Sequence, residues 1–274
     1  MVDITATMVK ELRERTGAGL KDCKKALTEN DGDLEAAVAT IRKMGLSKLE
    51  KKSHRSTEEG HIGHIIRDDV AVMAEIVCET DFVAKNEKFQ NFMKSILECA
   101  ADGDFAEGDN IADQVVAGRQ DDLGELIASC GENIQVRRVC RWQPQARVHA
   151  YVHDGGGAKI AGMVEIEGEH DDEYGKHMAM HVVAAAPEYL APEDVPEDRL
   201  QSEKEIIAAQ PDMAGKPENV VDKIVNGRLN KWYAQVCLTR QTWVHDDKSV
   251  VEKVNPKATV RRYLRWQVGE DLGA

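Results

Sequence analysis

The chain has 274 residues with 36 basic and 49 acidic side chains, so its formal net charge is −13. This charge argues against an extended phosphate-binding surface, which requires a basic footprint. A composition of 42% hydrophobic and 31% charged residues is typical of a globular rather than a disordered chain. The low aromatic content, 5%, favours a helix-rich protein over an all-β one.

The sequence contains no apolar run near the roughly 18 residues that a membrane span requires. Its first residues, MVDITATMVKEL, lack the apolar core of a signal peptide, so a cytoplasmic protein is the simplest interpretation. The cysteines form no CxxC pair, which argues against a structural zinc site or a disulfide framework. We expect buried thiols in a reducing compartment. The six cysteines are Cys23, Cys78, Cys99, Cys130, Cys140 and Cys237.

Residues 1–55 predict a module of three short helices. Thr5 is expected to cap the first helix and Asp33 the third, and the first should end where Gly17 permits a chain reversal. The three apolar faces are Ile4, Met8, Val9 and Leu12; Cys23, Ala26 and Leu27; and Leu34, Ala37, Val38, Ile41 and Met44. The module carries 12 basic and 9 acidic residues, so its charge is +3 while the remainder carries −16. Residues 47–60 have almost no apolar side chain and are predicted to be a linker.

From Gly60 the pattern becomes strand-like, with two β-branched runs at 61–66 and 70–78 around an expected hairpin turn at Asp68-Asp69. A helix should follow, with an apolar face made of Phe89, Phe92, Met93, Ile96 and Leu97. Residues 100–130 alternate acidic loops with short helical pieces. Residues 133–142 predict another strand.

This hairpin–helix unit recurs weakly in the second half of the chain. Residues 148–152 and 160–166 flank a glycine turn at 154–157, and a helix is expected over 177–186. The recurrence predicts a duplicated α+β core of two small antiparallel sheets, each backed by helices. The groove between two such halves would be a natural contact surface.

A helical hairpin is expected at about 195–236. One helix is marked by Leu200, Ile206 and Ile207, and the breaker Gly215-Lys216-Pro217 separates it from a second. The second carries Val221, Ile224, Val225, Leu229, Trp232 and Val236. The hairpin could project and pair with another chain, or pack on its own domain. The predicted division is 1–55 for the helical module, 56–146 and 147–259 for the two half-domains, and 260–274 for a C-terminal segment.

Sites for cofactors or catalysis are weakly supported. The glycines at 17–19 follow a helix rather than a strand, and Gly175-Lys176-His177 lacks the spacing of a phosphate-binding loop. His177 and His181 share one helical face, but the string HMAMH lacks the glutamate of zinc proteases and no third ligand is evident. No Ser/His/Asp order is recognisable. We therefore expect no bound nucleotide, metal or cofactor, and a packed or interfacial histidine pair.

The most informative stretch is Thr80-Asp81-Phe82-Val83-Ala84-Lys85-Asn86, where a strand gives way to a helix. The residues alone favour a structural interpretation, in which Thr80 or Asp81 caps the helix and Phe82 begins its buried face. The alternative is an exposed aromatic wedge that enters a partner's pocket. Anchors of that kind contribute about 2–4 kcal/mol in interfaces.

At these residues the chain resembles the bacterial elongation factor Ts family, whose members exchange nucleotide on elongation factor Tu. The resemblance covers essentially the whole chain, and its departures are the polar linker SHRSTEEGH and a short tail after Gly269-Glu270. The matching segments are VKELRERTGAGLKDCKKAL, GDLEAAVATIRKMG, ETDFVAKNEKFQ, GENIQVRRV, KHMAMHVVAAAPEYL, GKPENVVDKIVNGRLNKWY and RYLRWQVGE.

The resemblance implies a role for each part of the chain. The three-helix, UBA-like module would dock on the GTPase domain of elongation factor Tu, with Leu20 and Lys24 as candidate contacts. Its hallmark segment, here Thr80 to Val83, would intrude near the nucleotide and help dislodge the magnesium ion, with Phe82 as the wedge. The helix with His177 and His181 would contact a more distant domain of the partner.

The resemblance also implies that the hairpin at about 195–236 is the family's coiled-coil protrusion, linked to self-association in some members. The C-terminal segment would pack toward the GTPase domain. No nucleic acid or membrane partner is implied, and the protein would act by binding rather than by catalysis. Two other functions remain open: an adaptor that holds a partner without driving exchange, and a cysteine- or metal-dependent enzyme.

Overall fold

The computed structural model describes residues 3–52, 55–155, 158–213 and 216–272, which form two compact units. The first unit comprises residues 1–143, 154–159 and 267–274, and the second comprises residues 144–153 and 160–266. Within the described ranges, no helix is long and apolar enough to cross a membrane. All six cysteines carry free thiols, and four of them are buried.

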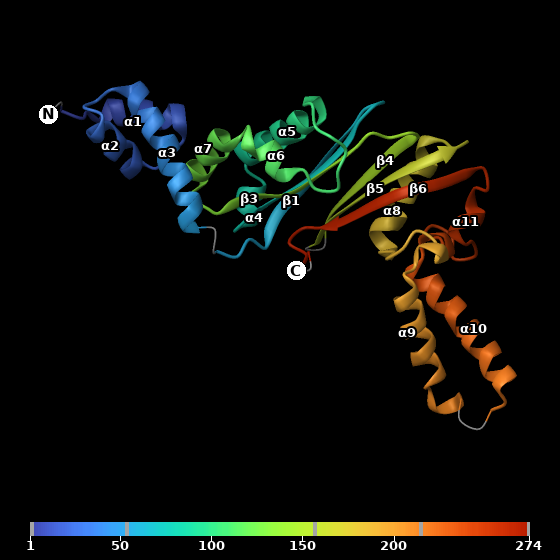
Figure 1. Ribbon diagram of the computed structural model, residues 1–274. Coiled ribbons are helices and arrows are strands. Elements are labelled where there is room, and N and C mark those ends of the chain that lie inside the picture. The colour runs from blue at the N-terminus through green and yellow to red at the C-terminus, as the bar shows by residue number, and fades with distance from the viewer. Residues whose placement is uncertain (1–2, 53–54, 156–157, 214–215, 273–274) are drawn as a thin grey trace. The chain divides into compact units, whose positions relative to one another are not determined.

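The first unit contains a three-helix module and a three-stranded sheet with its helices (Figure 1). Its elements are α1 (Ala6–Thr16), α2 (Leu20–Glu29), α3 (Leu34–Lys52), β1 (Glu59–Ile66), β2 (Ala71–Cys78), α4 (Asp81–Ala84), α5 (Glu87–Asp102), α6 (Ala112–Ala117), α7 (Gln120–Cys130) and β3 (Ile134–Trp142).

The three-helix module is built as its sequence predicts. Thr5 caps α1 by accepting a hydrogen bond from the Met8 amide, and Gly17 ends it with a positive φ of 69°. The module's core also includes Ala128 of α7, so α3 packs against the rest of the first unit through α7. The linker prediction for 47–60 is wrong at both ends, because α3 continues to Lys52 and β1 begins at Glu59, although residues 55–58 form neither helix nor strand. Lys, Leu and Glu are strong helix formers, so a polar run can extend a helix without an apolar face.

The first sheet is antiparallel with the strand order β1-β2-β3. The hairpin turn lies at Asp68-Asp69 as predicted, and the Arg67 amide donates to the Val70 carbonyl. Helix α5 covers one face of the sheet, where its predicted apolar residues join β2 in one buried cluster. On β2 all eight residues are buried, including the charged Glu75.

The second unit contains a sheet of order β4-β5-β6, covered by α8, and a helical hairpin. Its elements are β4 (Arg147–Gly155), β5 (Ala158–Gly168), α8 (Asp172–Ala185), η1 (Pro192–Asp194), α9 (Glu197–Ala208), η2 (Pro211–Met213), α10 (Glu218–Val236), η3 (Leu238–Arg240), α11 (Val251–Val254) and β6 (Ala258–Gln267). Helix α8 starts earlier than the predicted His177, because the Asp171 side chain caps it through the Tyr174 amide.

The predicted helical hairpin is formed by α9 and α10, which extend side by side away from the sheet of β4, β5 and β6 (Figure 1). Two small apolar clusters hold the pair together, one at its base around Val236 and one around Leu229. Ile207 is buried in the second cluster, whereas the neighbouring Ile206 is 54% exposed. Of the glycine turn predicted at 154–157, the first two residues belong to β4, and 156–157 lie outside the described residues, as does the breaker residue Gly215.

The duplication is confirmed at the level of topology, since each half has a hairpin, then helices, then a third strand beside the hairpin's second strand. The sequence repeats along the matching strands. β3 contains VRRVCRW (136–142) and β6 contains VRRYLRW (260–266), while MAEI (73–76) on β2 matches MVEI (163–166) on β5. The α+β fold class is therefore correct.

Matched residues of the two repeats make matched contacts. In the first half the Arg141 Nε atom donates to the Ala100 carbonyl of α5 at 3.0 Å. In the second half the Arg265 Nε atom donates to the Val183 carbonyl of α8 at 3.2 Å. Each arginine thus ties the third strand to the helix that covers its own sheet.

Each repeat also buries a glutamate on its central strand. Glu75 accepts hydrogen bonds from Arg138 Nε at 2.5 Å, Arg137 Nη1 at 3.3 Å and the Gly269 amide at 2.8 Å, and Arg138 reaches Glu270 at 2.7 Å. These contacts compensate the desolvation of a carboxylate that is fully buried. They also fasten the C-terminal residues to the first sheet.

The equivalent residue of the second repeat is Glu165, which is 2% exposed. It accepts from Arg262 Nε at 2.6 Å and from the amides of Gln145 and Ala146 at 2.7 and 2.9 Å. In both repeats the backbone donors come from the segment that follows the other repeat's third strand.

Candidate functional site

The segment between β2 and α5 contains two helix caps in succession. Thr80 Oγ1 accepts a hydrogen bond from the Val83 amide at 3.4 Å and starts the four-residue α4. Asn86 Oδ1 accepts from the Lys88 amide at 2.9 Å and starts α5. The second cap breaks the single helix that the sequence predicts, and Phe82 therefore belongs to α4 and not to the buried face of α5.

Phe82 is 82% exposed, the most exposed of the large hydrophobic side chains among the described residues. The prediction that Thr80 caps a helix is confirmed, but the prediction that Phe82 begins a buried face is wrong. Burial of a phenylalanine side chain contributes about 1.5–3 kcal/mol of stability, but folding of this protein leaves the Phe82 side chain in water. Such a side chain is available to a partner at little cost.

The corner that presents Phe82 is held by the loop after α7. Glu132 accepts hydrogen bonds from both the Thr80 amide, at 3.0 Å, and the Thr80 hydroxyl, at 2.7 Å. Glu79 accepts from the Asn133 amide at 2.6 Å and from Arg55 Nη1 at 3.2 Å. Sequence analysis missed these glutamates because their contacts join residues 24 to 54 positions apart.

Polar contacts within the corner stabilise its short helix, α4. Asp81 and Lys85 form an ion pair of 2.8 Å, and the hydrogen bond from Lys85 lowers the pKa of the Asp81 carboxyl group. Gln90 Nε2 donates to the Ala84 carbonyl at 2.6 Å, which satisfies a helix end. Phe82 thus extends from a short, well-bonded corner.

The first unit presents a second exposed apolar residue on the three-helix module. Leu20 opens α2 and is 55% exposed, and Lys24 is exposed one turn later. These two predicted contact residues therefore lie on an accessible helix face. Leu20 and Phe82 are candidates for contact with one partner from two separate elements.

The two histidines of the second unit occupy different environments. His181 is fully buried, where its Nε2 atom bonds Gln241 Oε1 at 3.0 Å and its Nδ1 atom accepts from the Val244 amide at 3.2 Å. Burial lowers the pKa of His181, so the ring is neutral. His177 is half-buried and stacks on His245 at 4.2 Å. His181 is therefore a packed residue, whereas His177 lies nearer the surface.

Comparison with known proteins identifies the family. The family model described as "Elongation factor TS" matches residues 79–270. The chain is 41% identical to "Elongation factor Ts" of Halorhodospira halophila, over 98% of this chain and 93% of that one. It is 43% identical to the protein of the same name from Methylococcus capsulatus (99% and 94% covered) and 43% identical to that of Arthrospira platensis (90% and 100% covered). With most of its length matched by the family model and nearly all of it by these relatives, the chain belongs to the elongation factor Ts family of translation elongation factors.

Proposed function

We propose that this protein promotes the release of GDP from elongation factor Tu. The exposed Phe82, held on the Glu132-bonded corner, carries the proposal, because it is an aromatic anchor on a pre-formed support. Near the nucleotide it would displace the loop that helps to hold magnesium. A GTPase holds its nucleotide partly through a magnesium ion that bridges the phosphates, so weaker magnesium binding speeds release.

The energetics require several contacts. A roughly 10³-fold acceleration corresponds to about 4 kcal/mol in barrier height, and one buried phenylalanine supplies only part of that. Leu20 and Lys24 on α2, and His177 on α8, are proposed to supply further contacts with the partner. The burial of His181 gives it a supporting role behind this surface. Because binding linkage is reciprocal, nucleotide would weaken this protein's binding by the same factor, so the complex would be transient.

The proposed activity uses binding energy alone and needs no catalytic group or cofactor. We place the protein in the cytoplasm with its partner. The α9–α10 hairpin is a candidate surface for self-association. The domain division 1–55, 56–146, 147–259 and 260–274 stays a prediction.

The test is release of a fluorescent GDP analogue from purified elongation factor Tu, with and without this protein. We expect acceleration by the wild type and a loss of about 30-fold or more with Phe82→Ala, since truncation of a central anchor costs about 2 kcal/mol or more. Ile206→Ala is the matched control, because it also truncates an exposed apolar residue.

Each outcome has a defined meaning. If the protein binds elongation factor Tu without speeding release, it is an adaptor and the proposal is wrong. If Phe82→Ala is as active as Ile206→Ala, exchange occurs but Phe82 is not the wedge.

A further inference from the structure

Lys88 connects three helices of the first unit at one point. It lies in the first turn of α5, and its Nζ atom donates to Ser129 Oγ near the end of α7 at 2.9 Å. Gly17, at the end of α1, lies directly against this pair. A Cβ atom added to Gly17 would stand 1.9 Å from Lys88 Nζ and 2.8 Å from Ser129 Oγ. We call Gly17, Lys88 and Ser129 the Lys88 joint.

Gly17 is constrained both by its positive φ and by the atoms close to it. A comparison with Gly131 distinguishes the two constraints. Its φ of +69° favours glycine, as does the φ of +77° at Gly131, which ends α7. At Gly131, however, an added Cβ atom would meet nothing within 4 Å. Gly17 therefore serves the close approach of α1 to Lys88 as well as the end of a helix.

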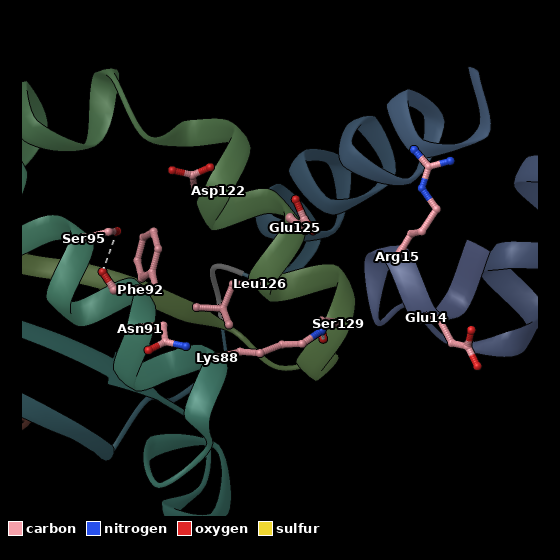
Figure 2. Close-up of a pocket in the computed structure, with 10 residues that line it drawn as sticks. All are labelled: Glu14, Arg15, Lys88, Asn91, Phe92, Ser95, Asp122, Glu125, Leu126 and Ser129. Atoms are coloured by element: carbon pink, nitrogen blue, oxygen red, sulfur yellow. Dashed lines mark hydrogen bonds between the residues drawn. The ribbon is translucent and has the colours of Figure 1, made fainter. Parts of the chain in front are cut away.

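The Lys88 joint lies where two grooves meet. The first groove is lined by Glu14 and Arg15 of α1 and by residues of α5 and α7, and Figure 2 shows Lys88 reaching toward Ser129 beside it. The second groove is lined by Phe82 and again by Lys88 and Ser129. Lys88 and Ser129 of the joint therefore line both grooves, whereas Gly17 and the proposed wedge, Phe82, line only the second.

The joint gives the three-helix module a second point of attachment. The first is along α7, where Ala128 enters the module's core and Arg42 lies 3.8 Å from Glu125. Packing along a single helix would leave the module free to rock about it. A contact at the end of α1 opposes that motion, because it fixes a second and separate element.

We propose that the Lys88 joint sets the position of Leu20 relative to Phe82, so that both reach the partner together. Leu20 follows Gly17 by three residues, and Phe82 precedes Lys88 by six. Gly17, Lys88 and Ser129 are positioning residues in this scheme, and the inference rests on the proposed function. Fixing two contact elements before binding raises affinity because less ordering is needed in the complex.

The experiment compares Lys88→Met and Gly17→Ala with two matched controls, Lys94→Met on the same helix and Gly131→Ala. Each full-length protein is titrated into elongation factor Tu loaded with a fluorescent GDP analogue. We expect the half-saturating concentration to rise about tenfold in the two joint variants, with the maximal release rate changed by less than about twofold. Lys94→Met should match the wild type, and Gly131→Ala, which places alanine at a positive φ without meeting other atoms, should have a smaller effect than Gly17→Ala.

A second measurement reports the position of the module directly. Spin labels on unnatural amino acids at Lys25 of α2 and Gln114 of α6 leave the native cysteines untouched. We expect a narrow distance distribution in the wild type and both controls, and a broadened one in both joint variants.

The two measurements separate the two hypotheses. If the wild type does not speed GDP release from elongation factor Tu, the proposed function is wrong. The distance distributions alone then test whether the Lys88 joint fixes the position of the module. Unchanged distributions in Lys88→Met and Gly17→Ala would overturn the joint, as would equal effects of Gly17→Ala and Gly131→Ala.

Discussion

The carboxylate of Glu132 replaces two hydrogen bonds that the start of α4 would otherwise make to water. It accepts from the Thr80 amide and hydroxyl, so the corner under Phe82 depends on a residue 52 positions away. The sequence predicted the Thr80 cap, which is local, but not this support. Phe82 was misplaced for a related reason, because the Asn86 cap interrupts a pattern that otherwise reads as one continuous helix.

Glu132→Gln tests this support. An amide retains one oxygen and loses the charge, so we expect a loss of about 1 kcal/mol in the free energy of unfolding and a several-fold weaker stimulation of GDP release. Urea unfolding and the exchange assay measure both quantities. Glu98→Gln, on the outer side of α5, is the control and should change neither; equal effects in both variants would contradict a specific role for Glu132.

The buried ring of His181 makes stability depend on pH. In the folded protein, burial lowers the pKa of His181 below its ordinary value of 6.5. Below about pH 6.5 the unfolded chain therefore binds a proton that the folded chain does not. The stability that His181 contributes is therefore fully present above its pKa in the unfolded chain. It is lost as the pH falls toward the lower pKa of His181 in the folded protein. We expect lower unfolding free energy at pH 5.5 than at pH 7.5.

His181→Gln isolates this effect from other histidines. The substitution removes the titrating group and leaves the Val244 amide unpaired, which costs about 1–3 kcal/mol at pH 7.5. The decline between pH 7.5 and 5.5 should nevertheless be smaller than in the wild type. Denaturant unfolding at the two pH values measures this decline in unfolding free energy. An equal decline in both proteins would show that His181 does not cause it.

At the scale of elements, the α9–α10 hairpin has one small apolar cluster of its own. The cluster around Ile207, Met213 and Leu229 is made entirely within the hairpin. The apolar spacing predicted these helices, but Ile206 and Ile207 could not be told apart, because adjacent apolar residues both fit a short helical stripe. Only packing decides which of the two faces α10.

Leu229→Ala tests whether the hairpin opens independently. Truncating this buried leucine removes about 2–5 kcal/mol of local packing, so the hairpin should open before the sheet does. Hydrogen exchange should accelerate in residues 197–236 and stay unchanged in β5. Lys231→Ala, on the exposed side of α10, is the control, and uniform acceleration across the second unit would show that the hairpin is not independent.

At the scale of the whole molecule, the duplicated strands explain most of the architecture. Sequence analysis found the hairpin–helix recurrence through its apolar pattern but overlooked the clearer VRRxxRW repeat. These strands are rich in arginine, and their buried role becomes visible only once Glu75 and Glu165 are placed opposite Arg138 and Arg262. A charged residue on a central strand is not predictable from hydrophobic periodicity.

Glu75→Gln should be among the most damaging single substitutions. It leaves Arg138, only 7% exposed, without its buried counter-charge, so we expect a loss of about 3–5 kcal/mol in unfolding free energy. Thermal and urea unfolding measure the loss against the same Glu98→Gln control. A loss below about 1 kcal/mol would mean that Glu270 alone neutralises the arginine.

The pairing of Gly269 with Glu75 also bears on how the polypeptide is made. These residues are 194 positions apart in the chain. A ribosome builds the chain from its N-terminus, so the buried carboxylate of the first sheet is fully bonded only after Gly269 has been synthesised. A nascent chain that has not reached Gly269 would therefore carry a Glu75 carboxylate that lacks one of its hydrogen bonds.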